Sequence, residues 1–488
     1  TINLKLSRPD LQLVTGLNTF FTNGKGLNFP ANIVATFVLP GGFTISDTTA
    51  REVFQDRLLN LEKPNGELIY GKFKMYWTNF LGYACWKEDR DFKLSRHIRN
   101  YDYPGQMSLP SAPSQAILES KLSLLLRTKW IRTQSPWEVL LIQNYRGSGQ
   151  TVFIFRIDHA LGDGRSFLGI LRNVTGAELK FPSFKISVAL KKSDLFFKSL
   201  EIPFYSYLHL LEYGDRKRLP AGPGPLGLDY GGTTISISPE IPVEVIKRIK
   251  KHFNVSYACV LYAAISGAIS RALEGSDQNV PNDFSAGLVL PKPNPSSSSS
   301  TDSSDDLSLE AYFAETTLPL KASTGAERLL QIEKSLQLLR KSCIPMAFDL
   351  IFKMHALLPL AWMSRRMPKT PSVSISIVPV TTSRDSYQGF EISEMSSFIS
   401  NMLDYDISIV TYGLNNKQRL SFCPMRWAQL VTNCKTSEGK KFPEKAVLRV
   451  VHCKCDEYSV AIIGRLPNQL WLFPVIFYKL FLGKNLTR

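Results

Sequence analysis

"WEVLLIQNYRGSGQTVFIFRIDHALGDGRSF", residues 137–167, contains two apolar runs separated by the short segment "RGSGQ". Both runs have the length and the content of β-branched and aromatic residues that β-strands favour. A five-residue connection that contains glycine is typical of the turn between two antiparallel strands. The stretch therefore predicts a β-hairpin over residues 137–159.

The second strand of this hairpin ends on a histidine. Because side chains alternate between the two faces of a strand, His159 shares a face with Phe153, Phe155 and Ile157. Apolar surroundings disfavour the charged form of an imidazole. We therefore expect His159 to be neutral near pH 7.

The two residues that alternate with this face carry opposite charges. Asp158 and Arg156 lie two positions apart on the other side of the strand. We expect them to form an ion pair with a structural role. Asp158 and His159, which point to opposite faces, should not act as a catalytic pair.

The strand is followed by a turn of small residues and then by a short amphipathic helix. Gly162 and Gly164 allow the backbone or a ligand to approach closely. Asp163 stands where a helix N-cap or a first-turn anion belongs, so we expect it to fix the turn. Apolar residues at spacings of three and four predict the helix over residues 167–174.

The residues alone leave two interpretations of His159 open. It could be a packed histidine with no chemical role, or it could be a general base. A neutral imidazole is the usual group that removes a proton from a hydroxyl near pH 7.

Length and charge narrow the function classes. At 488 residues the chain exceeds the size at which a single core stops growing, so we expect at least two domains. The formal net charge of +16 attracts nucleic acid, anionic lipid or phosphate-bearing small molecules. The basic residues are spread through the chain without a nucleic-acid-binding motif, so we expect no nucleic acid partner.

The cysteines predict neither disulfides nor a metal. Seven irregularly spaced cysteines in a chain of this size are more typical of reduced thiols. His452, Cys453 and Cys455 lack a second ligand pair at the usual spacing, so we expect no metal site.

Glycine and proline residues indicate where the chain divides into two halves. The Gly- and Pro-rich stretch 214–232 predicts a connector between an N-terminal half, residues 1–213, and a C-terminal half, residues 233–488. A serine-rich segment, residues 293–308, cannot bury enough apolar surface to order itself and should be a disordered loop. In the second half we expect a largely buried helix over residues 255–273 and strands over residues 372–380 and 404–412.

The apolar segments of the sequence could span a membrane or lie at its surface. We find no run of 18 or more apolar residues without charges. Residues 470–488 and 195–211 combine aromatic residues with lysines, histidine or arginine, as segments at a lipid interface do. Docking of these segments on the protein core is an equally good interpretation.

Three segments resemble one family in the correct order. "HALGDG", residues 159–164, resembles the H-x-x-x-D-G motif of CoA-dependent acyltransferases. "WKEDRDFKLSRHIR", residues 86–99, and "SPWEVLLIQNY", residues 135–145, are similar to segments of the wax ester synthase/diacylglycerol acyltransferase family. The chain departs from the family at Asp158, where the motif has its first histidine, at Ala258 and Cys259, where an Asn-Asp pair is usual, and at Ile377, where an asparagine is usual.

The resemblance implies an α/β fold of two chloramphenicol-acetyltransferase-like halves, with mixed sheets flanked by helices and an active-site tunnel at the interface of the halves. It implies that His159 is the general base and that Asp163 and Gly164 hold the motif in shape. Phe153, Phe155 and Ile157 would then line the tunnel. His97, within the similar segment 86–99, is expected to be structural.

The resemblance also implies the chemistry. The protein would be an acyltransferase that uses acyl-CoA as co-substrate, without a permanently bound cofactor, to form wax esters from long-chain fatty alcohols. Diacylglycerol is a second candidate acceptor, and a lipid-binding protein of impaired activity is the alternative. We expect it at the cytosol-facing membrane surface of the endoplasmic reticulum or of a lipid droplet, with an N-terminal anchor preceding Thr1.

Overall fold

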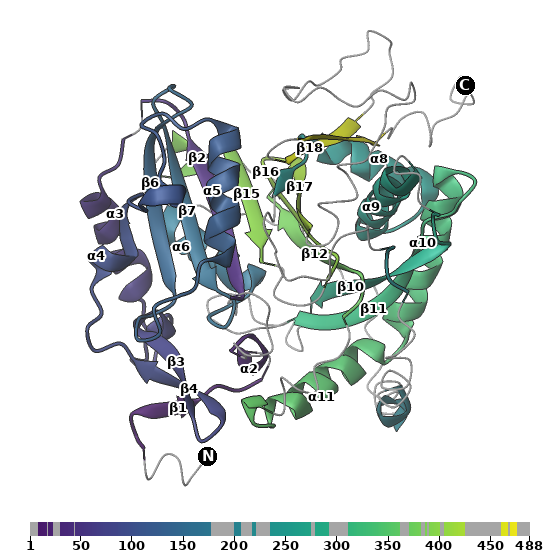
Figure 1. Cartoon of the computed structure of the whole chain (residues 1–488). Helices are drawn as coiled ribbons and strands as arrows, with labels where there is room; N and C mark the ends of the chain where they lie inside the picture. Colours follow the sequence, from purple (N-terminus) through teal and green to yellow (C-terminus); the bar gives the residue numbers. More distant parts are fainter. Residues whose placement is uncertain are drawn as a thin grey trace.

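Two β-sheets, each covered by helices, form two lobes that lie side by side (Figure 1). The computed structural model describes residues 8–16, 18–22, 30–42, 44–176, 200–205, 217–220, 235–274, 279–291, 311–361, 370–381, 386–387, 390–400, 405–424, 460–466 and 469–475.

The N-terminal lobe is built on a five-stranded sheet with the strand order β15-β2-β7-β6-β5. The predicted hairpin is confirmed, because β6 and β7 pair antiparallel from Trp137 opposite Ile157 to Tyr145 opposite Gln150. Helices α3 and α6 cover one face of this sheet and α5 covers the other. The elements are β2 (Asn32–Leu39), α3 (Asp47–Phe54), β5 (Ile98–Asn100), α5 (Gln115–Arg127), β6 (Trp137–Tyr145), β7 (Gln150–Asp158), α6 (Gly164–Thr175) and β15 (Glu394–Ile399).

The C-terminal lobe contains a second sheet with the order β11-β10-β12-β16-β17-β8, and β9 pairs with β17. The predicted helix and both predicted strands of the second half are confirmed as α9, β12 and β16. Helix α9 is apolar around most of its circumference, as a helix buried between a sheet and other helices must be. The elements are β8 (Ser236–Ile237), β9 (Ile241–Pro242), α8 (Val243–Phe253), α9 (Tyr257–Glu274), β10 (Asp283–Pro291), β11 (Ala311–Pro319), α10 (Gly325–Lys341), β12 (Val373–Val380), β16 (Ile407–Leu414) and β17 (Lys417–Pro424).

One strand connects the lobes. β15 belongs to the second half of the sequence but pairs antiparallel with β2, from Glu394 opposite Val38 to Ile399 opposite Ile33. The sheet of the N-terminal lobe therefore includes a strand that the division into residues 1–213 and 233–488 assigns to the other half. The boundaries of the connector stay a prediction, because only residues 217–220 of it are described.

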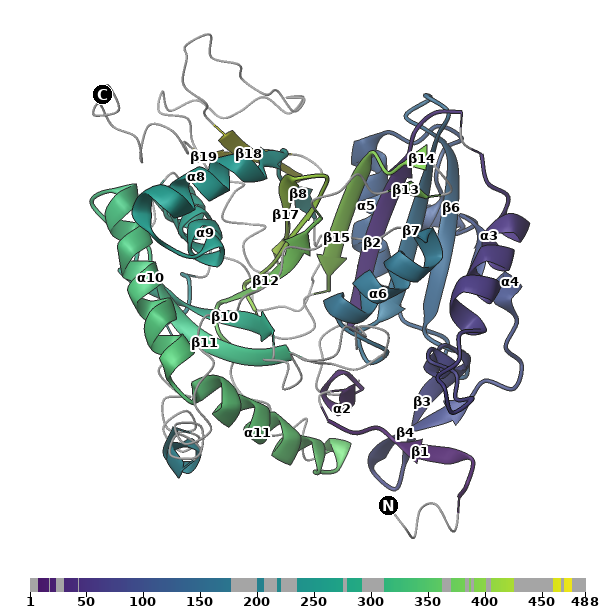
Figure 2. The ribbon, with the colours of Figure 1, turned by 180° about the vertical axis from the view of Figure 1, so that it is seen from behind.

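Smaller elements complete the lower edge of the molecule. A three-stranded sheet with the order β1-β4-β3 lies below the first lobe, and α2 lies between it and α11 (Figure 2). These elements are β1 (Leu11–Leu13), α2 (Asn18–Phe21), β3 (Met75–Phe80), β4 (Tyr83–Glu88) and α11 (Ile344–Ala356).

Several expectations concern segments that are described only in part. The serine-rich segment 293–308 lies outside the described residues, and so do His452, Cys453 and Cys455. Of residues 470–488, the described part is in strand β19 (Gln469–Val475), which pairs with β18 (Val460–Leu466). Within the described residues no single helix has the length and apolarity to cross a bilayer, although the bent pair α8 and α9 together meets that test of composition.

Removal of the largest buried side chain of β15 should destabilise the N-terminal lobe. Phe398 is fully buried among side chains of β2 and α5, so Phe398→Ala should lower the free energy of unfolding by about 3–5 kcal/mol. Ile131→Ala, at a residue that is 62% exposed, is the control and should change it by about 0.5 kcal/mol or less. Urea denaturation followed by circular dichroism measures both. Equal effects of the two substitutions would contradict the role given to β15.

Candidate functional site

His159 directly follows β7 and is held by backbone hydrogen bonds on both sides. Its N–H donates to the carbonyl of Ala31 at 2.6 Å, which extends the pairing with β2 by one residue. The carboxylate of Asp158 accepts from the N–H of Ala160 at 2.9 Å, and the Asp158 carbonyl accepts from the N–H of Leu161. The chain therefore turns sharply at the histidine with little freedom to reposition it.

The second half of the motif begins helix α6. Asp163 Oδ1 accepts from the N–H of Ser166 at 3.0 Å, which is the geometry of an N-cap. A β-carbon at Gly164 would lie 3.6 Å from Val378 Cγ2, an ordinary contact, so glycine is not sterically required there by the described atoms. Val378 belongs to β12, so the motif turn packs against the C-terminal lobe.

A short helix covers the imidazole. The ring of Phe21 stacks on that of His159, with centroids 4.0 Å apart and planes 2° from parallel. Asn18, on the same helix α2, donates from Nδ2 to the carbonyl of Ala160 at 2.7 Å. Neither residue was singled out by the sequence, because α2 is 138 residues or more distant along the chain and carries no motif.

His159 is buried and has an unpaired nitrogen. The residue is 9% exposed, and its Nδ1 is buried with no hydrogen-bond partner in the structure. Burial lowers the pKa of His159 below its usual value, although the carboxylate of Asp163 acts in the opposite direction. The lowered pKa favours the neutral imidazole, which is the form that can accept a proton.

The expected ion pair between Asp158 and Arg156 is wrong. Arg156 instead pairs with Glu138, directly opposite it on β6, with Nη1 2.7 Å from Oε1. Burial alone would raise the pKa of Glu138, but Arg156 and Arg99 hold it below its usual value. A residue directly across an antiparallel ladder is closer than one two positions along the same strand, so the cross-strand partner is favoured.

Asp158 is left buried without that partner. Burial raises its pKa from the usual 3.8 to about 7, opposed by the N–H of Ala160 and by the charge of Arg156. Asp158 therefore exchanges its proton near neutral pH. Its side chain shares a turn with His159 but bonds the backbone.

The aromatic residues of β7 lie beside a small apolar cavity. Phe153 and Phe155, with Phe167 of α6, line a space of about 50 Å³, which is far below the ~300–1,000 Å³ of common ligand pockets. Ile157 and His159 are not among its lining residues. Two of the three predicted tunnel residues thus share one cavity that does not include the histidine.

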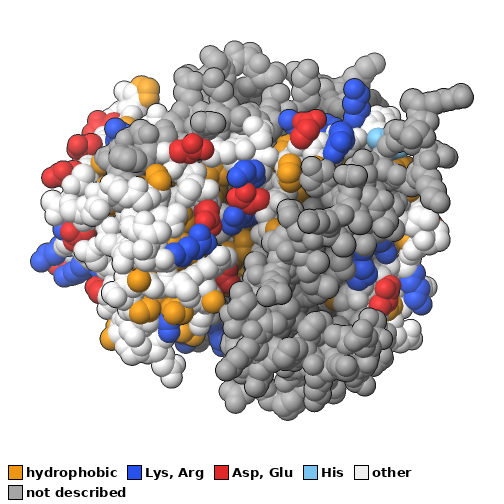
Figure 3. All heavy atoms as spheres, turned by 90° about the horizontal axis from the view of Figure 1, so that it is seen from above, with side chains coloured by type: hydrophobic (Ala, Val, Ile, Leu, Met, Phe, Trp, Pro, Cys, Tyr) orange, Lys and Arg blue, Asp and Glu red, His pale blue; other side chains and the backbone are white. Residues whose placement is uncertain are grey.

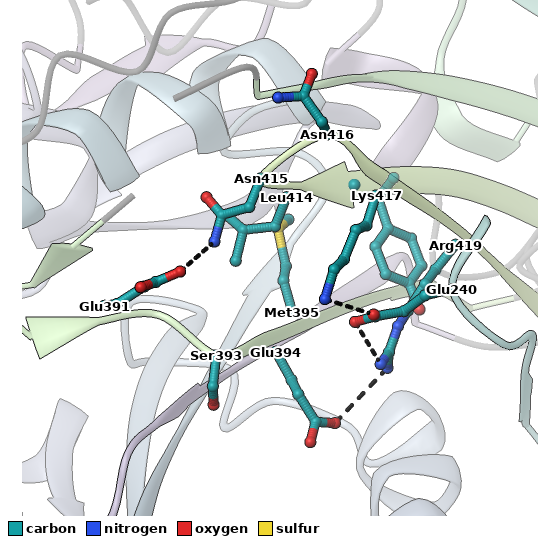
Figure 4. Close-up of a pocket in the computed structure, with 12 residues that line it drawn as sticks. Glu240, Glu391, Ser393, Glu394, Met395, Leu414, Asn415, Asn416, Lys417 and Arg419 are labelled. Atoms are coloured by element: carbon teal, nitrogen blue, oxygen red, sulfur yellow. Dashed lines mark hydrogen bonds and ion pairs between the residues drawn. The ribbon is translucent and has the colours of Figure 1, made fainter. Parts of the chain in front are cut away.

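A larger cavity lies where the two lobes meet, at β15 and the turn between β16 and β17. Its volume is about 380 Å³, and its walls are largely polar (Figure 4). Glu240 bonds Lys417 at 2.8 Å and Arg419 at 2.9 Å, and Arg419 reaches Glu394 of β15 at 3.6 Å. Seen from above, acidic and basic side chains lie close together near the middle of the molecule (Figure 3). His159 does not line this cavity either, so the tunnel stays a prediction.

His97 has a structural environment. Its Nδ1 lies 2.7 Å from the carbonyl of Trp137, and its ring stacks between Trp137 and Phe92. Within the described ranges, no three His, Cys, Asp or Glu side chains are grouped as metal ligands. Among the described residues, Cys85, Cys259, Cys343 and Cys423 form no disulfide.

No protein-family model and no curated protein sequence matches this chain. Solved structures do match in fold. A wax ester synthase/diacylglycerol acyltransferase from Marinobacter aquaeolei VT8 is 15% identical with a TM-score of 0.52, over 85% of this chain and 93% of that one. The starter condensation domain of rhizomide synthetase in complex with C8-CoA is 13% identical with a TM-score of 0.51, over 90% and 93%. The first condensation domain of the calcium-dependent antibiotic synthetase, in complex with a substrate analogue, is 11% identical with a TM-score of 0.51, over 85% and 90%.

The predicted fold class is confirmed by these likenesses. The chain has the two-lobed α/β fold with chloramphenicol-acetyltransferase-like halves that these structures share. The resemblance found in the motif segments thus extends over most of the chain at the level of the fold.

Replacement of Asp158 should remove a pH-dependent loss of stability. Because its pKa is raised, the folded protein binds the proton more tightly than the unfolded chain between pH 3.8 and about 7. Stability therefore falls as the pH rises through this interval. Asp158→Asn, which can still accept from Ala160, should be more stable than the wild type by about 1–3 kcal/mol at pH 8 and nearly equal at pH 4. Thermal melting at both pH values measures this.

The control for this prediction is Glu52→Gln, at an exposed position of α3. It should follow the wild type at both pH values. A destabilising effect of Asp158→Asn at pH 8 would show that the carboxylate form is required by the turn.

Removal of the Phe21 ring should expose His159 to reagents. Phe21→Ala uncovers one face of the imidazole, so diethyl pyrocarbonate should modify His159 several-fold faster than in the wild type. Peptide mass spectrometry follows each histidine separately. The exposed His252 should react at the same rate in both proteins, and the buried His97 should stay slow. An unchanged rate at His159 would mean that Phe21 does not limit access.

Proposed function

We propose that this protein is an acyltransferase that transfers an acyl group from acyl-CoA to the hydroxyl of a long-chain fatty alcohol, forming a wax ester, with His159 as general base. The observation that carries the proposal is the state of His159. Burial lowers the pKa of its imidazole, which favours the neutral form, and its Nδ1 is buried and unpaired. His159 directly follows the central strand β7, and the motif turn after it packs against Val378 of the C-terminal lobe.

The reaction needs one proton-accepting group. The imidazole of His159 takes the proton of the alcohol while the alcohol oxygen attacks the thioester carbon. The carbon–sulfur bond then breaks, the ester is released, and the CoA sulfur takes the proton from the imidazolium. No enzyme nucleophile is required, and a general base of this kind contributes about 10² to 10⁴ in rate.

The turn around His159 suits this role because it fixes the ring. Asn18 bonds the backbone directly after His159, and Asp163 bonds the backbone at the start of α6. Small misplacements of a base are costly in rate. Asp158 and Asp163 both bond the backbone, so in this proposal they are positioning residues. Phe21 covers one face of the ring, so a reactant approaches the nitrogens at the ring edge.

The choice of substrates rests on the resemblance and on the structures of similar fold. One of these is named as a wax ester synthase/diacylglycerol acyltransferase, and another contains C8-CoA. Acyl-CoA is accordingly the proposed donor, a fatty alcohol the first acceptor and diacylglycerol the second. Such substrates reside in membranes and lipid droplets, so we propose a cytosol-facing lipid surface, at the endoplasmic reticulum or a droplet, as the place of action.

One observation favours a second function, a lipid-binding protein without turnover. The imidazole is covered by Phe21, is 9% exposed and lines neither described cavity. The departures from the family pattern at Asp158, Ala258 and Cys259 also favour a protein without turnover. Cys259 is buried and donates its thiol to the carbonyl of Leu329, so it has a structural role.

Loss of the imidazole should abolish most turnover. With palmitoyl-CoA and hexadecanol, His159→Ala should release free thiol about 10² to 10⁴ times more slowly than the wild type. His252→Ala, at an exposed histidine of α8, is the control and should retain full activity. Because the pKa of His159 is lowered, the rate should fall only below the usual histidine value of 6.5 as the pH decreases.

The outcomes separate the candidates. Substantial turnover by a folded His159→Ala protein would show that the general-base assignment is wrong. Absence of thiol release by the wild type with every alcohol and with diacylglycerol would favour the lipid-binding function. Preference for acetyl-CoA and a short alcohol would indicate a small-molecule acetyltransferase.

A further inference from the structure

Helix α11 has an apolar face that points away from the protein. Leu350, Met354 and Leu357 follow one another at spacings of four and three, so they share one side of the helix and of its C-terminal turn. They are 43%, 58% and 67% exposed. Phe348, on the opposite side of the helix, is buried at 8% exposure. A surface helix normally turns a mainly polar face to water, whereas on this outer side one charged side chain, Lys353 paired with Asp349, lies among three exposed apolar side chains.

Exposed apolar side chains continue from α11 in both directions. Leu81, at the turn between β3 and β4, is 82% exposed, and the N–H of Leu360 donates to the adjacent Gly82 carbonyl at 2.7 Å. At the other end Cys343 contacts Glu201, in a helical segment of residues 200–205. In both ribbon views, α11 and the β3–β4 hairpin lie along the lower edge of the molecule (Figures 1 and 2). We call the exposed apolar side chains of these segments the apolar edge; they are Leu81, Leu200, Phe204, Leu350, Met354 and Leu357.

We propose that the apolar edge docks on an anionic phospholipid surface. Large side chains such as these insert into the boundary between headgroups and acyl chains, and anionic headgroups attract a basic protein. The chain carries a formal net charge of +16, which is opposite to that of an anionic bilayer. A second copy of the chain would carry the same +16 and would be repelled, so charge selects the lipid surface over self-association.

The apolar edge is connected to His159 through contacts between α11 and α2. Phe352, on the inner side of α11, packs edge-on against Phe20 of α2 with centroids 5.3 Å apart. The next residue, Phe21, is the one that stacks on His159. A lipid surface at α11 would therefore lie next to α2, the helix whose Phe21 stacks on His159. This link to the site rests on the proposed function, whereas docking itself does not.

A vesicle-binding experiment with matched variants tests the proposal. The edge variant is Leu350→Ser/Met354→Ser/Leu357→Ser. The control variant, Ile131→Ser/Leu330→Ser/Leu338→Ser, removes three side chains that are 62%, 54% and 63% exposed on other elements. Co-sedimentation with vesicles of phosphatidylcholine and phosphatidylserine should show at least tenfold weaker binding of the edge variant, and near wild-type binding of the control. Melting curves verify that both variants fold.

Three results would overturn the proposal. One is equal binding by the two variants, and another is failure of the wild-type protein to bind vesicles with phosphatidylserine. The third is a wild-type dimer in light scattering that the edge substitutions convert to a monomer, which would assign the edge to a second copy. None of these measurements involves turnover, so they stand whether or not thiol release is observed.

Discussion

The pairing of β7 on both sides constrains the candidate site more than any other interaction. β7 lies between β2 and β6, and the register with each strand determines which face every side chain of β7 occupies. A shift of one residue would place Arg156 and Asp158 among the aromatic residues and His159 on the side of α5. The buried pair of Arg156 with Glu138 acts against such a shift, because it would separate the two charges inside the protein.

The parts of the fold that local patterns specify could be predicted. The hairpin of residues 137–159, the buried helix α9 and the strands β12 and β16 each follow from periodicity and turn residues within the segment itself. The pairing of β15 with the sheet of the N-terminal lobe could not be predicted, because nothing in "EMSSFI" indicates that its partner is β2, more than 350 residues earlier. The error at Arg156 has a similar origin, since neighbours on one strand are visible in the sequence and neighbours across a ladder are not.

In the candidate site, too, only the residues within a local motif could be predicted. His159 and Asp163 were found because they lie in a short motif, whereas Asn18 and Phe21 reach the motif from a distant helix. The sequence predicted an apolar setting for the histidine, and burial does lower the pKa of His159. The source of that burial is different from the expected one, since the stacking partner is Phe21 and not a side chain of β7. A face-to-face aromatic contact leaves the ring edge, with its nitrogens, as the part that a reactant must approach.

The strand that crosses between the lobes also affects how the protein is made. When β7 has left the ribosome, β2 has one partner and its other edge presents unpaired N–H and C=O groups. The strand that covers this edge ends at Ile399, about 240 residues later, which corresponds to roughly 10–50 s of synthesis. During this interval the nascent N-terminal lobe has an open sheet edge beside apolar side chains. Such an intermediate is the kind that chaperones bind, so the demand for protection during synthesis is a consequence of the topology itself.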